Sequence, residues 1–300
     1  MSESTIVTIP AVILDRAEWT EYEQRHLQRV QRFVGPHEQR ARTGTPHPVW
    51  DFLFTYYSLK PRQLRRWHPG FGVGLRGAGH YVGRGGYDIS GSRGSVVTVT
   101  DEHLAGRLDT VAFVADLLAA TAARPARLNC FGLHEWAMVY RAPEVRHQQV
   151  PLRLGPAGTD AVVESMPLRC SHFDAYRFFT AAAVGRNSDV LSRADQPAHE
   201  QPGCVHANMD LYKWCYKLGS LVESDLLMDC LDLAAQARML DMQASPYDLA
   251  EYGIAPIAIE DAAGRAEYVR RQHDIADRGA PLRATLLARC DALLSHGGAR

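Results

Sequence analysis

The sequence predicts a mainly α-helical fold, a single-domain multi-helix bundle with a few short β-strands. Three observations lead to this prediction. Apolar residues recur at three- and four-residue spacing in several segments beyond residue 100, which is the pattern of amphipathic helices. Glycine and proline interrupt the chain at intervals typical of helices. The 300 residues, 46% of them apolar, can bury a large core and show no internal repeat, so we expect residues 1–300 to form one domain.

The first third of the chain combines one predicted helix with stretches that glycine and proline should keep irregular. Asp15 can cap the helix, and Gly35-Pro36 is expected to end it. Ten glycines between residues 68 and 95 predict a glycine-rich irregular segment. The elements expected here are a helix over 15–34, a loop over 36–48, the irregular segment over 68–95 and a strand over 96–100.

Helices dominate the rest of the prediction. Residues 101–123 show the clearest three-four spacing of apolar residues, and Gly279 with Pro281 should separate the last two helices. The expected helices are 101–123, 127–141, 171–183, 205–218, 223–241, 264–278 and 281–295, with a hairpin arm over 160–170 and a short strand over 257–260.

Charge and cysteine content narrow the class of protein. The formal net charge of −1 does not favour a nucleic-acid partner, because phosphate neutralisation normally requires a basic excess. The six cysteines form no CxxC pair, so we expect reduced and mostly buried thiols. Pro10 interrupts the apolar residues 6–14, and no basic region precedes them. Without an apolar run of about 20 residues, the prediction is a cytoplasmic protein that does not enter the membrane.

Four short segments place ionisable residues on otherwise apolar helices, and we expect them to line one polar pocket. The first contains His134 and Glu135 in a run that is apolar or aromatic up to Arg141. Burying such a pair costs several kcal/mol unless each group is paired or ligated. A satisfied core histidine with a buried ion pair, and a functional site, are both open interpretations.

The second segment contains His172 and Asp174. Residues two apart on a helix point about 200° away from each other, so these two cannot bind one metal ion without help from the helix end. Asp174 and Arg177 are spaced i,i+3 and can simply form an ion pair. That pairing is the favoured role for Arg177.

The third segment runs from Glu200 through a Pro-Gly turn into a helix. His206 and Asp210 are spaced i,i+4 and therefore share one side of this helix. The spacing suits two metal ligands, or an acid that orients an imidazole. A partly exposed His–Asp pair beside Lys213 is the competing structural interpretation.

The fourth segment is acidic. Asp225, Asp229 and Asp232 follow one helical stripe, which is more typical of a solvated face than of a site. Asp241 lies between apolar residues and is harder to explain without a function. Tyr247 follows the helix in a Ser-Pro turn, a position where pocket residues often occur.

These segments supply the candidate site residues. The catalytic candidates are His134, Glu135, His206, Asp210 and Asp241. The candidate metal ligands are His134, Glu135, His172, Asp174, Glu200, His206 and Asp210. The substrate-binding candidates are Trp136, Tyr212, Lys213, Arg238 and Tyr247.

Five strings in the chain are distinctive, namely HPVWDFLFTYYSLKP, FGLHEWAMVYR, CSHFDAYRFF, EQPGCVHANMDLYKW and LDMQASPYDL. Through them the chain resembles, over roughly residues 46–290, a bacterial family that carries the label 3-methyladenine DNA glycosylase. The resemblance implies activity on a DNA base, and it carries no catalytic residues over to this chain.

Three functions follow from these residues. The preferred one is an enzyme with a His/carboxylate site between helices, which binds a divalent metal such as iron and acts on a small aromatic or heterocyclic molecule. The metal would activate oxygen or water, so the enzyme would be an oxidoreductase or a hydrolase. The sequence leaves the oligomeric state open.

Two alternative functions remain open. A DNA glycosylase or nucleobase-binding protein could stack a flipped base on Trp50, Tyr56, Tyr57 and Trp67, with Asp210 or Asp241 as the acid. A haem or small-cofactor binding protein could use axial ligands, for which the candidates are His134, Met138, His172 and His206.

Overall fold

The computed structural model describes residues 10–90, 96–143 and 150–298, and helices predominate among them. The predicted mainly α fold with a few short strands is therefore confirmed. The helices are α1 (Arg16–Thr43), α2 (Phe52–Thr55), α3 (Pro61–Leu64), α4 (Asp101–Ala105), α5 (Leu108–Ala122), α6 (Leu133–Ala137), α7 (Gly155–Ser165), α8 (Phe173–Tyr176), α9 (Ala181–Val184), α10 (Gln196–His199), α11 (Val205–Leu218), α12 (Ser224–Gln243) and α13 (Ala262–Gly298). The strands are β1 (Val12–Leu14), β2 (Val73–Arg76), β3 (Tyr87–Ser90) and β4 (Val96–Val99), and short 3-10 helices cover Gly79–Tyr81, Gly219–Leu221 and Ala250–Tyr252.

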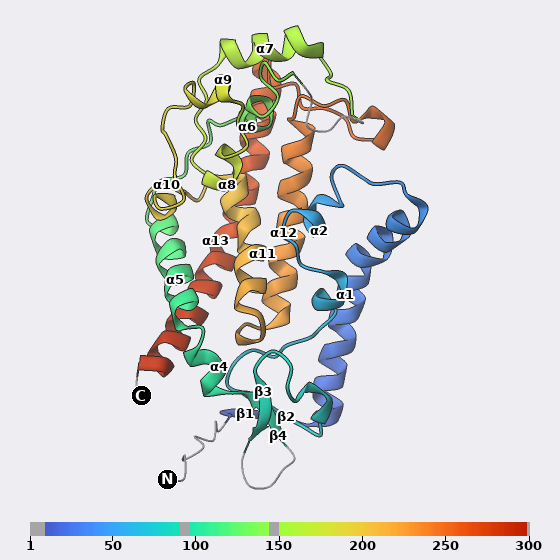
Figure 1. The fold of residues 1–300 in the computed structure, drawn as a ribbon, viewed down its shortest axis with the longest axis vertical. Helices are drawn as coiled ribbons and strands as arrows, with labels where there is room; N and C mark the ends of the chain where they lie inside the picture. Colours follow the sequence, from blue (N-terminus) through green and yellow to red (C-terminus); the bar gives the residue numbers. More distant parts are fainter. Residues whose placement is uncertain (1–9, 91–95, 144–149, 299–300) are drawn as a thin grey trace.

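Long helices form the body of the molecule, and short elements close its two ends (Figure 1). Helices α11, α12 and α13 pack against one another, α5 lies along α13, and α1 contacts α12. The sheet lies at the lower end in Figure 1, and the short helices α6 to α10 lie toward the upper end. Every residue of α11 except Tyr216 and Lys217 is buried, as expected for a helix enclosed on all sides.

The small sheet corrects the prediction for residues 68–95. Its strand order is β1-β2-β4-β3, with β1 parallel to β2 and the other pairs antiparallel. β2 and β3 both lie inside the segment expected to be irregular. Gly74 is part of β2, and the positive-φ residues Gly77, Gly83, Gly85 and Gly86 lie in the connection between the two strands. Residues 91–95 lie outside the described part of the chain. The strand expected at 96–100 is confirmed as β4.

Helix α1 is longer than predicted. It begins after Asp15 but continues through Gly35-Pro36 to Thr43, so the expected loop over 36–48 starts too early. Its buried residues include Val30 and Val34, which pack against the core in the two turns before the proline. The helix ends instead at Gly44, which adopts a left-handed φ of 66°. The apolar residues 6–14 are described only from residue 10, and part of them forms β1.

Residues 127–141 show the largest departure from the predicted helices. Only Leu133–Ala137 is helical, because Phe131 and Gly132 both have positive φ, at 49° and 70°. A left-handed phenylalanine is sterically unfavourable and cannot continue a right-handed helix. This break turns α6 into a single buried turn that carries His134 and Glu135.

Several other element predictions were also wrong. Gly106 divides the helix expected at 101–123 into α4 and α5, and the segment expected at 171–183 forms the short helices α8 and α9. The hairpin arm expected at 160–170 is mostly helix α7, and no strand forms at 257–260. The helix over 205–218 is confirmed as α11, and the one over 223–241 as α12 with small shifts at its ends.

The two helices expected at 264–278 and 281–295 are one continuous helix, α13. Gly279 does not break it but lets it approach α11 closely, since a Cβ at this position would overlap Asn208 Oδ1. The Asn208 side chain cannot easily move away. Its Oδ1 accepts a 2.7 Å hydrogen bond from Arg283, and its Nδ2 donates to the carbonyl oxygens of Pro202 and Cys204.

Gly279→Ala is therefore expected to lower the free energy of unfolding by about 1–3 kcal/mol, the usual cost of overpacking a core. Chemical denaturation followed by circular dichroism measures it. Gly185→Ala is the matched control, because Gly185 has a negative φ of −73° and nothing within 4 Å of the added Cβ. Equal stabilities of the two variants would show that α13 does not need a glycine at this crossing.

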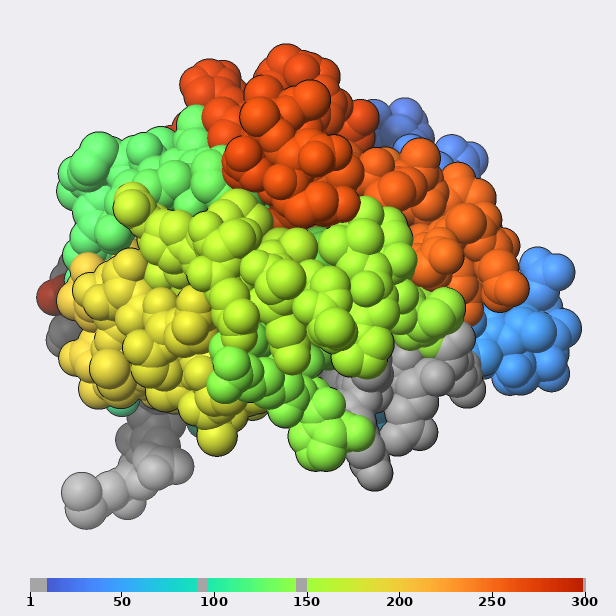
Figure 2. Space-filling view, turned by 90° about the horizontal axis from the view of Figure 1, so that it is seen from above, coloured from blue at the N-terminus to red at the C-terminus, as the bar shows by residue number. Residues whose placement is uncertain are grey.

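The short helices cover the upper ends of α11 and α12. Seen from this end, the chain of α7 to α10, coloured lime to yellow, covers the middle of the surface, and the orange and red helices border it (Figure 2). The first turn of α11 and the last turn of α12 lie in the interior under this cover, and their residues His206 and Asp241 are buried. No helix in the described ranges is long and apolar enough to cross a membrane.

Candidate metal centre

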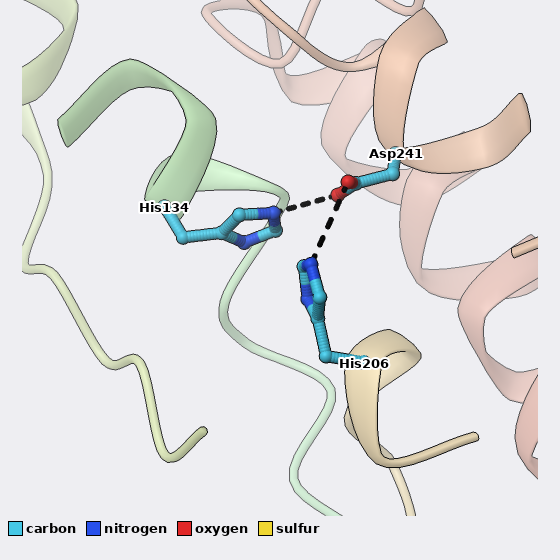
Figure 3. A group of neighbouring side chains, drawn as sticks. All are labelled: His134, His206 and Asp241. Carbon is cyan, nitrogen blue, oxygen red and sulfur yellow. Dashed lines mark ion pairs between the residues drawn. The ribbon is translucent and has the colours of Figure 1, made fainter. Parts of the chain in front are cut away.

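Three elements bring two imidazoles and one carboxylate together beneath this cover (Figure 3). His134 comes from α6, His206 from the first turn of α11, and Asp241 from the last turn of α12. All three are buried, with relative exposures of 5%, 5% and 0%. Each offers a ligand atom within 4.8 Å of the other two. This His134–His206–Asp241 group is the first of two such groups in the described residues.

The contact between His134 and Asp241 has the distance of a hydrogen bond without its orientation. His134 Nε2 lies 2.7 Å from Asp241 Oδ1. Both atoms are nevertheless buried without a hydrogen-bond partner among the described residues. The two atoms form a close ion pair, but neither has a well-oriented hydrogen bond, so the same arrangement also suits a further partner placed between them.

A metal ion could supply such a partner. Two atoms that each lie about 2.1 Å from one ion, at roughly 80–110° to each other, are about 2.7–3.4 Å apart. The separation of His134 Nε2 and Asp241 Oδ1 fits that range. His206 Nε2 lies 3.8 Å from Asp241 Oδ2, so a small adjustment would bring the second imidazole onto the same ion. The two rings are perpendicular, with centroids 4.5 Å apart.

Burial and neighbouring charges set the protonation of the group. Burial, together with the neighbouring His134, lowers the pKa of His206 to about 3, so its imidazole is neutral and can act as a ligand. Burial opposes the charge on His134, but the Asp241 carboxylate outweighs it and raises the pKa of His134. Burial would raise the pKa of Asp241, yet the two histidines and Arg238 hold it well below its usual value.

Arg238 braces the carboxylates of this group. Its Nη1 donates to Glu135 Oε1 at 2.9 Å and to Asp241 Oδ2 at 3.1 Å. The guanidinium also lies over the Phe52 ring, 3.8 Å from the centroid. Glu135, predicted as a metal ligand, therefore belongs to an ion pair and is not in either group that could hold a metal ion. The arginine occupies one oxygen of Asp241 and leaves Oδ1 facing His134.

A second group lies beside the first. His172, Glu200 and Asp210 also offer three ligand atoms within 4.8 Å of one another, and the His172 and His206 rings are 5.4 Å apart. His172 Nε2 is 3.2 Å from both Glu200 Oε1 and Asp210 Oδ2. The i,i+4 spacing had suggested that His206 and Asp210 act together, but the structure places them in different groups.

The second group already contains a protein cation. Lys213 Nζ donates to Asp210 Oδ2, the same oxygen that His172 approaches, and to Asp174 Oδ2 at 3.0 Å. Burial lowers the pKa of His172, but the Glu200 and Asp210 carboxylates outweigh it and raise that pKa. A protonated His172 and Lys213 together neutralise this group, so an ion-pair network accounts for it without a metal ion.

Asp174 is part of that network and belongs to neither of the two groups that could hold a metal ion. Its Oδ1 pairs with Arg177 at 3.3 Å, as the i,i+3 spacing predicted, and with Arg193, while its Oδ2 pairs with Lys213. The acidic stripe of α12 likewise proved structural, because Asp229 and Asp232 pair with Arg29 of α1. The cysteines of the described chain are free, and all but the half-buried Cys130 are buried, as expected.

A cavity of about 360 Å³ adjoins the first group. His206 lines this cavity and also contacts Asp241. It therefore connects the first group to the space where a small molecule could bind. Phe52 and Tyr56 stack in its wall, with ring centroids 4.7 Å apart and planes 10° from parallel. The residues lining it are Phe52, Thr55, Tyr56, Glu135, Met138, Asp174, Ala175, Phe178, His206 and Arg238.

Of the five predicted substrate-binding residues, one lines this cavity and the other four lie elsewhere in the described structure. Arg238 lines the cavity. Trp136 is 0% exposed and donates from Nε1 to the Ala244 carbonyl at 2.8 Å, so it is a core residue. Tyr212 is packed edge-on against Tyr57, and Lys213 serves the ion-pair network. Tyr247 is buried in a separate apolar cluster.

Asp241 was predicted as a catalytic candidate and not as a metal ligand, but the structure places it in a group that could hold a metal ion. Its signal in the sequence is an acidic residue between Leu240 and Met242 on a helix whose other acidic residues form an exposed stripe. The partner histidines lie more than 30 residues away, and sequence spacing says nothing about such contacts.

Comparisons with protein-family models, curated proteins and solved structures give no match for this chain. The resemblance to the glycosylase-labelled family therefore stays a prediction, and the functional argument depends on the site.

Proposed function

We propose that this protein is a metal-dependent enzyme, an oxidoreductase or hydrolase, that binds one divalent metal ion at His134, His206 and Asp241. The supporting observation is that two buried imidazoles and one buried carboxylate from three elements meet, with His134 Nε2 and Asp241 Oδ1 2.7 Å apart and not in a well-oriented hydrogen bond. Two histidines and one carboxylate are the donor set of non-haem Fe(II) enzymes, and they also suit zinc. We propose iron as the resident metal.

The proposed substrate is a small aromatic or heterocyclic molecule. The cavity of about 360 Å³ is of the size that encloses such a molecule, and its stacked Phe52 and Tyr56 rings favour a planar one. Glu135 and Arg238 add charged groups to the wall, which can orient polar substituents. His206 places the ligand group at the edge of this cavity.

The chain's own residues would bind the metal ion and orient the substrate. A bound metal would supply Lewis acidity, and in the case of iron redox chemistry. Arg238 holds Asp241 through Oδ2 and keeps its orientation, as partners of metal-ligating carboxylates commonly do. The cover formed by α7 to α10 keeps the histidines away from bulk water, which strengthens electrostatic interactions at the site.

The test is elemental analysis and an absorption spectrum of the purified full chain. We expect about one equivalent of metal per chain and its loss, to below about a tenth, in His206→Ala, because two remaining protein ligands hold a divalent ion weakly. His273→Ala is the control, since His273 is exposed on α13 and pairs only with Asp277. Equal metal content in wild type and His206→Ala would refute the proposed centre.

No observation favours either alternative function. Tyr57 and Trp67 are 1% and 4% exposed, so these two rings cannot receive a flipped base. The His206 ring centroid lies 4.5 Å from that of His134 and 5.4 Å from that of His172, too close for a porphyrin to fit between either pair.

A further inference from the structure

A second cavity, of about 320 Å³, lies at the opposite end of α11 from the metal centre. His206 lies in the first turn of α11 and Lys217 in its last. Eleven residues of helix separate them, about 16 Å along the axis. The cavity is formed where α3, the turn before β3, the α4–α5 junction and the end of α11 meet. The functional proposal above does not involve it.

The lining of this cavity is strongly basic. Its arginines and lysine are Arg65, Arg66, Arg84, Arg107 and Lys217, and its only acidic residue is Glu23. The whole chain carries a net charge of −1, so this accumulation of positive charge is local. A concave surface lined by one sign of charge attracts ligands of the opposite sign.

Most of these cations are not neutralised by the protein. Arg65 forms a two-pronged ion pair with Glu38, at 2.7 and 2.8 Å. Within the described ranges, Arg66, Arg84 and Arg107 have no carboxylate partner. The Arg107 Nη2 instead donates to a main-chain carbonyl, that of Lys217. Natural proteins rarely bring several unpaired cations together around a cavity without an anion to bind, because like charges repel.

The cavity wall is also held in place. Arg84 lies in a tight turn whose Gly85 and Gly86 have φ of 57° and 82°, a conformation that favours glycine. Ser220 Oγ donates a hydrogen bond to the Gly85 carbonyl and ties this turn to the end of α11. A binding site held in place before the ligand arrives loses less entropy on binding.

From this arrangement we propose that the cavity binds the phosphate groups of a small phosphorylated molecule. Arginine is the preferred partner of phosphate, since its planar group can donate two hydrogen bonds to one anion. The lining also supplies further donors from the histidines, and burial lowers the pKa of His68 to about 4, so that its ring is neutral there. A concave volume of about 320 Å³ suits a small molecule rather than a nucleic-acid duplex, which needs a longer stripe of positive charge.

The test is calorimetric titration of the full chain with inorganic pyrophosphate at fixed ionic strength. We expect saturable binding at one site, weakened about tenfold or more in both Arg66→Ala and Arg84→Ala, because each removes a charged hydrogen-bond donor. Arg62→Ala is the matched control, since Arg62 is an exposed residue of the same α3 that does not line the cavity.

Two outcomes would overturn the proposal. The first is no saturable binding of pyrophosphate, or binding that is equal in Arg84→Ala and Arg62→Ala. The second is binding of a short DNA duplex that requires Arg66 and Arg84 while pyrophosphate does not bind, which would make this surface part of a nucleic-acid interface. Thermal unfolding of each variant shows that it is folded, and the metal content should stay unchanged.

Discussion

Asp241→Asn is expected to abolish metal binding while leaving the helical fold in place. Asparagine keeps the size of the side chain but removes the charge that both histidines face at 2.7 and 3.8 Å. At a metal concentration about 100-fold above its Kd, binding adds about 2.7 kcal/mol of stability. For a chain of this size we expect the wild-type protein to unfold about 5 °C higher with metal than without it, and the variant to show no difference.

The control for this experiment comes from the same helix. Asp225→Asn changes an exposed carboxylate of α12 whose nearest cation, Arg29, is 4.0 Å away, so its metal content and metal-dependent shift should equal those of the wild type. A metal-dependent shift in Asp241→Asn as large as in the wild type would show that this group does not hold the ion. A shift lost equally in both variants would point to a nonspecific effect of charge.

Arg238→Met is expected to destabilise the protein by about 3–5 kcal/mol, since it removes one partner from a buried ion pair. The guanidinium is 1% exposed and donates to both Glu135 and Asp241. Without it, two carboxylates would face each other in the interior. Urea denaturation of the metal-free protein, followed by circular dichroism, measures the change in the free energy of unfolding.

Two further variants show whether the loss of stability in Arg238→Met comes from the buried carboxylates that it leaves without a cation. Adding Glu135→Gln to Arg238→Met should recover part of the stability, because one buried charge is removed. Arg289→Met breaks a peripheral ion pair with Glu223, whose side chains are 54% and 24% exposed, and should cost less than about 1 kcal/mol. A loss in Arg238→Met no larger than in Arg289→Met would contradict the bracing role.

Local sequence patterns predicted the bounds of a long helix well where the helix is buried on one face or on all sides. Helix α11 begins and ends at the predicted residues, because its apolar run starts after a Pro-Gly turn and stops at Gly219. The patterns failed where tertiary contacts overrode glycine and proline. Gly35-Pro36 and Gly279 lie inside helices α1 and α13, because packing against neighbouring helices stabilises both more than these residues destabilise them.

The sequence predicted which residues belong to the site, but not which of them contact one another. Polar residues on apolar helices must find partners once buried, so His134, His206 and Asp241 could be identified as candidates from their neighbours in the chain alone. The same reasoning also selected Asp174 and Glu135, which the structure assigns to ion pairs with Lys213 and Arg238.

The sequence by itself therefore determined the helical class of this protein and the small set of polar groups that its interior must accommodate. The tertiary structure alone decided which of these groups form ion-pair networks and which come together as a group that could hold a metal ion. The physical reason is distance along the chain. His134 and Asp241 meet at 2.7 Å although 107 residues separate them, and only the packing of α6 against the end of α12 brings about that contact.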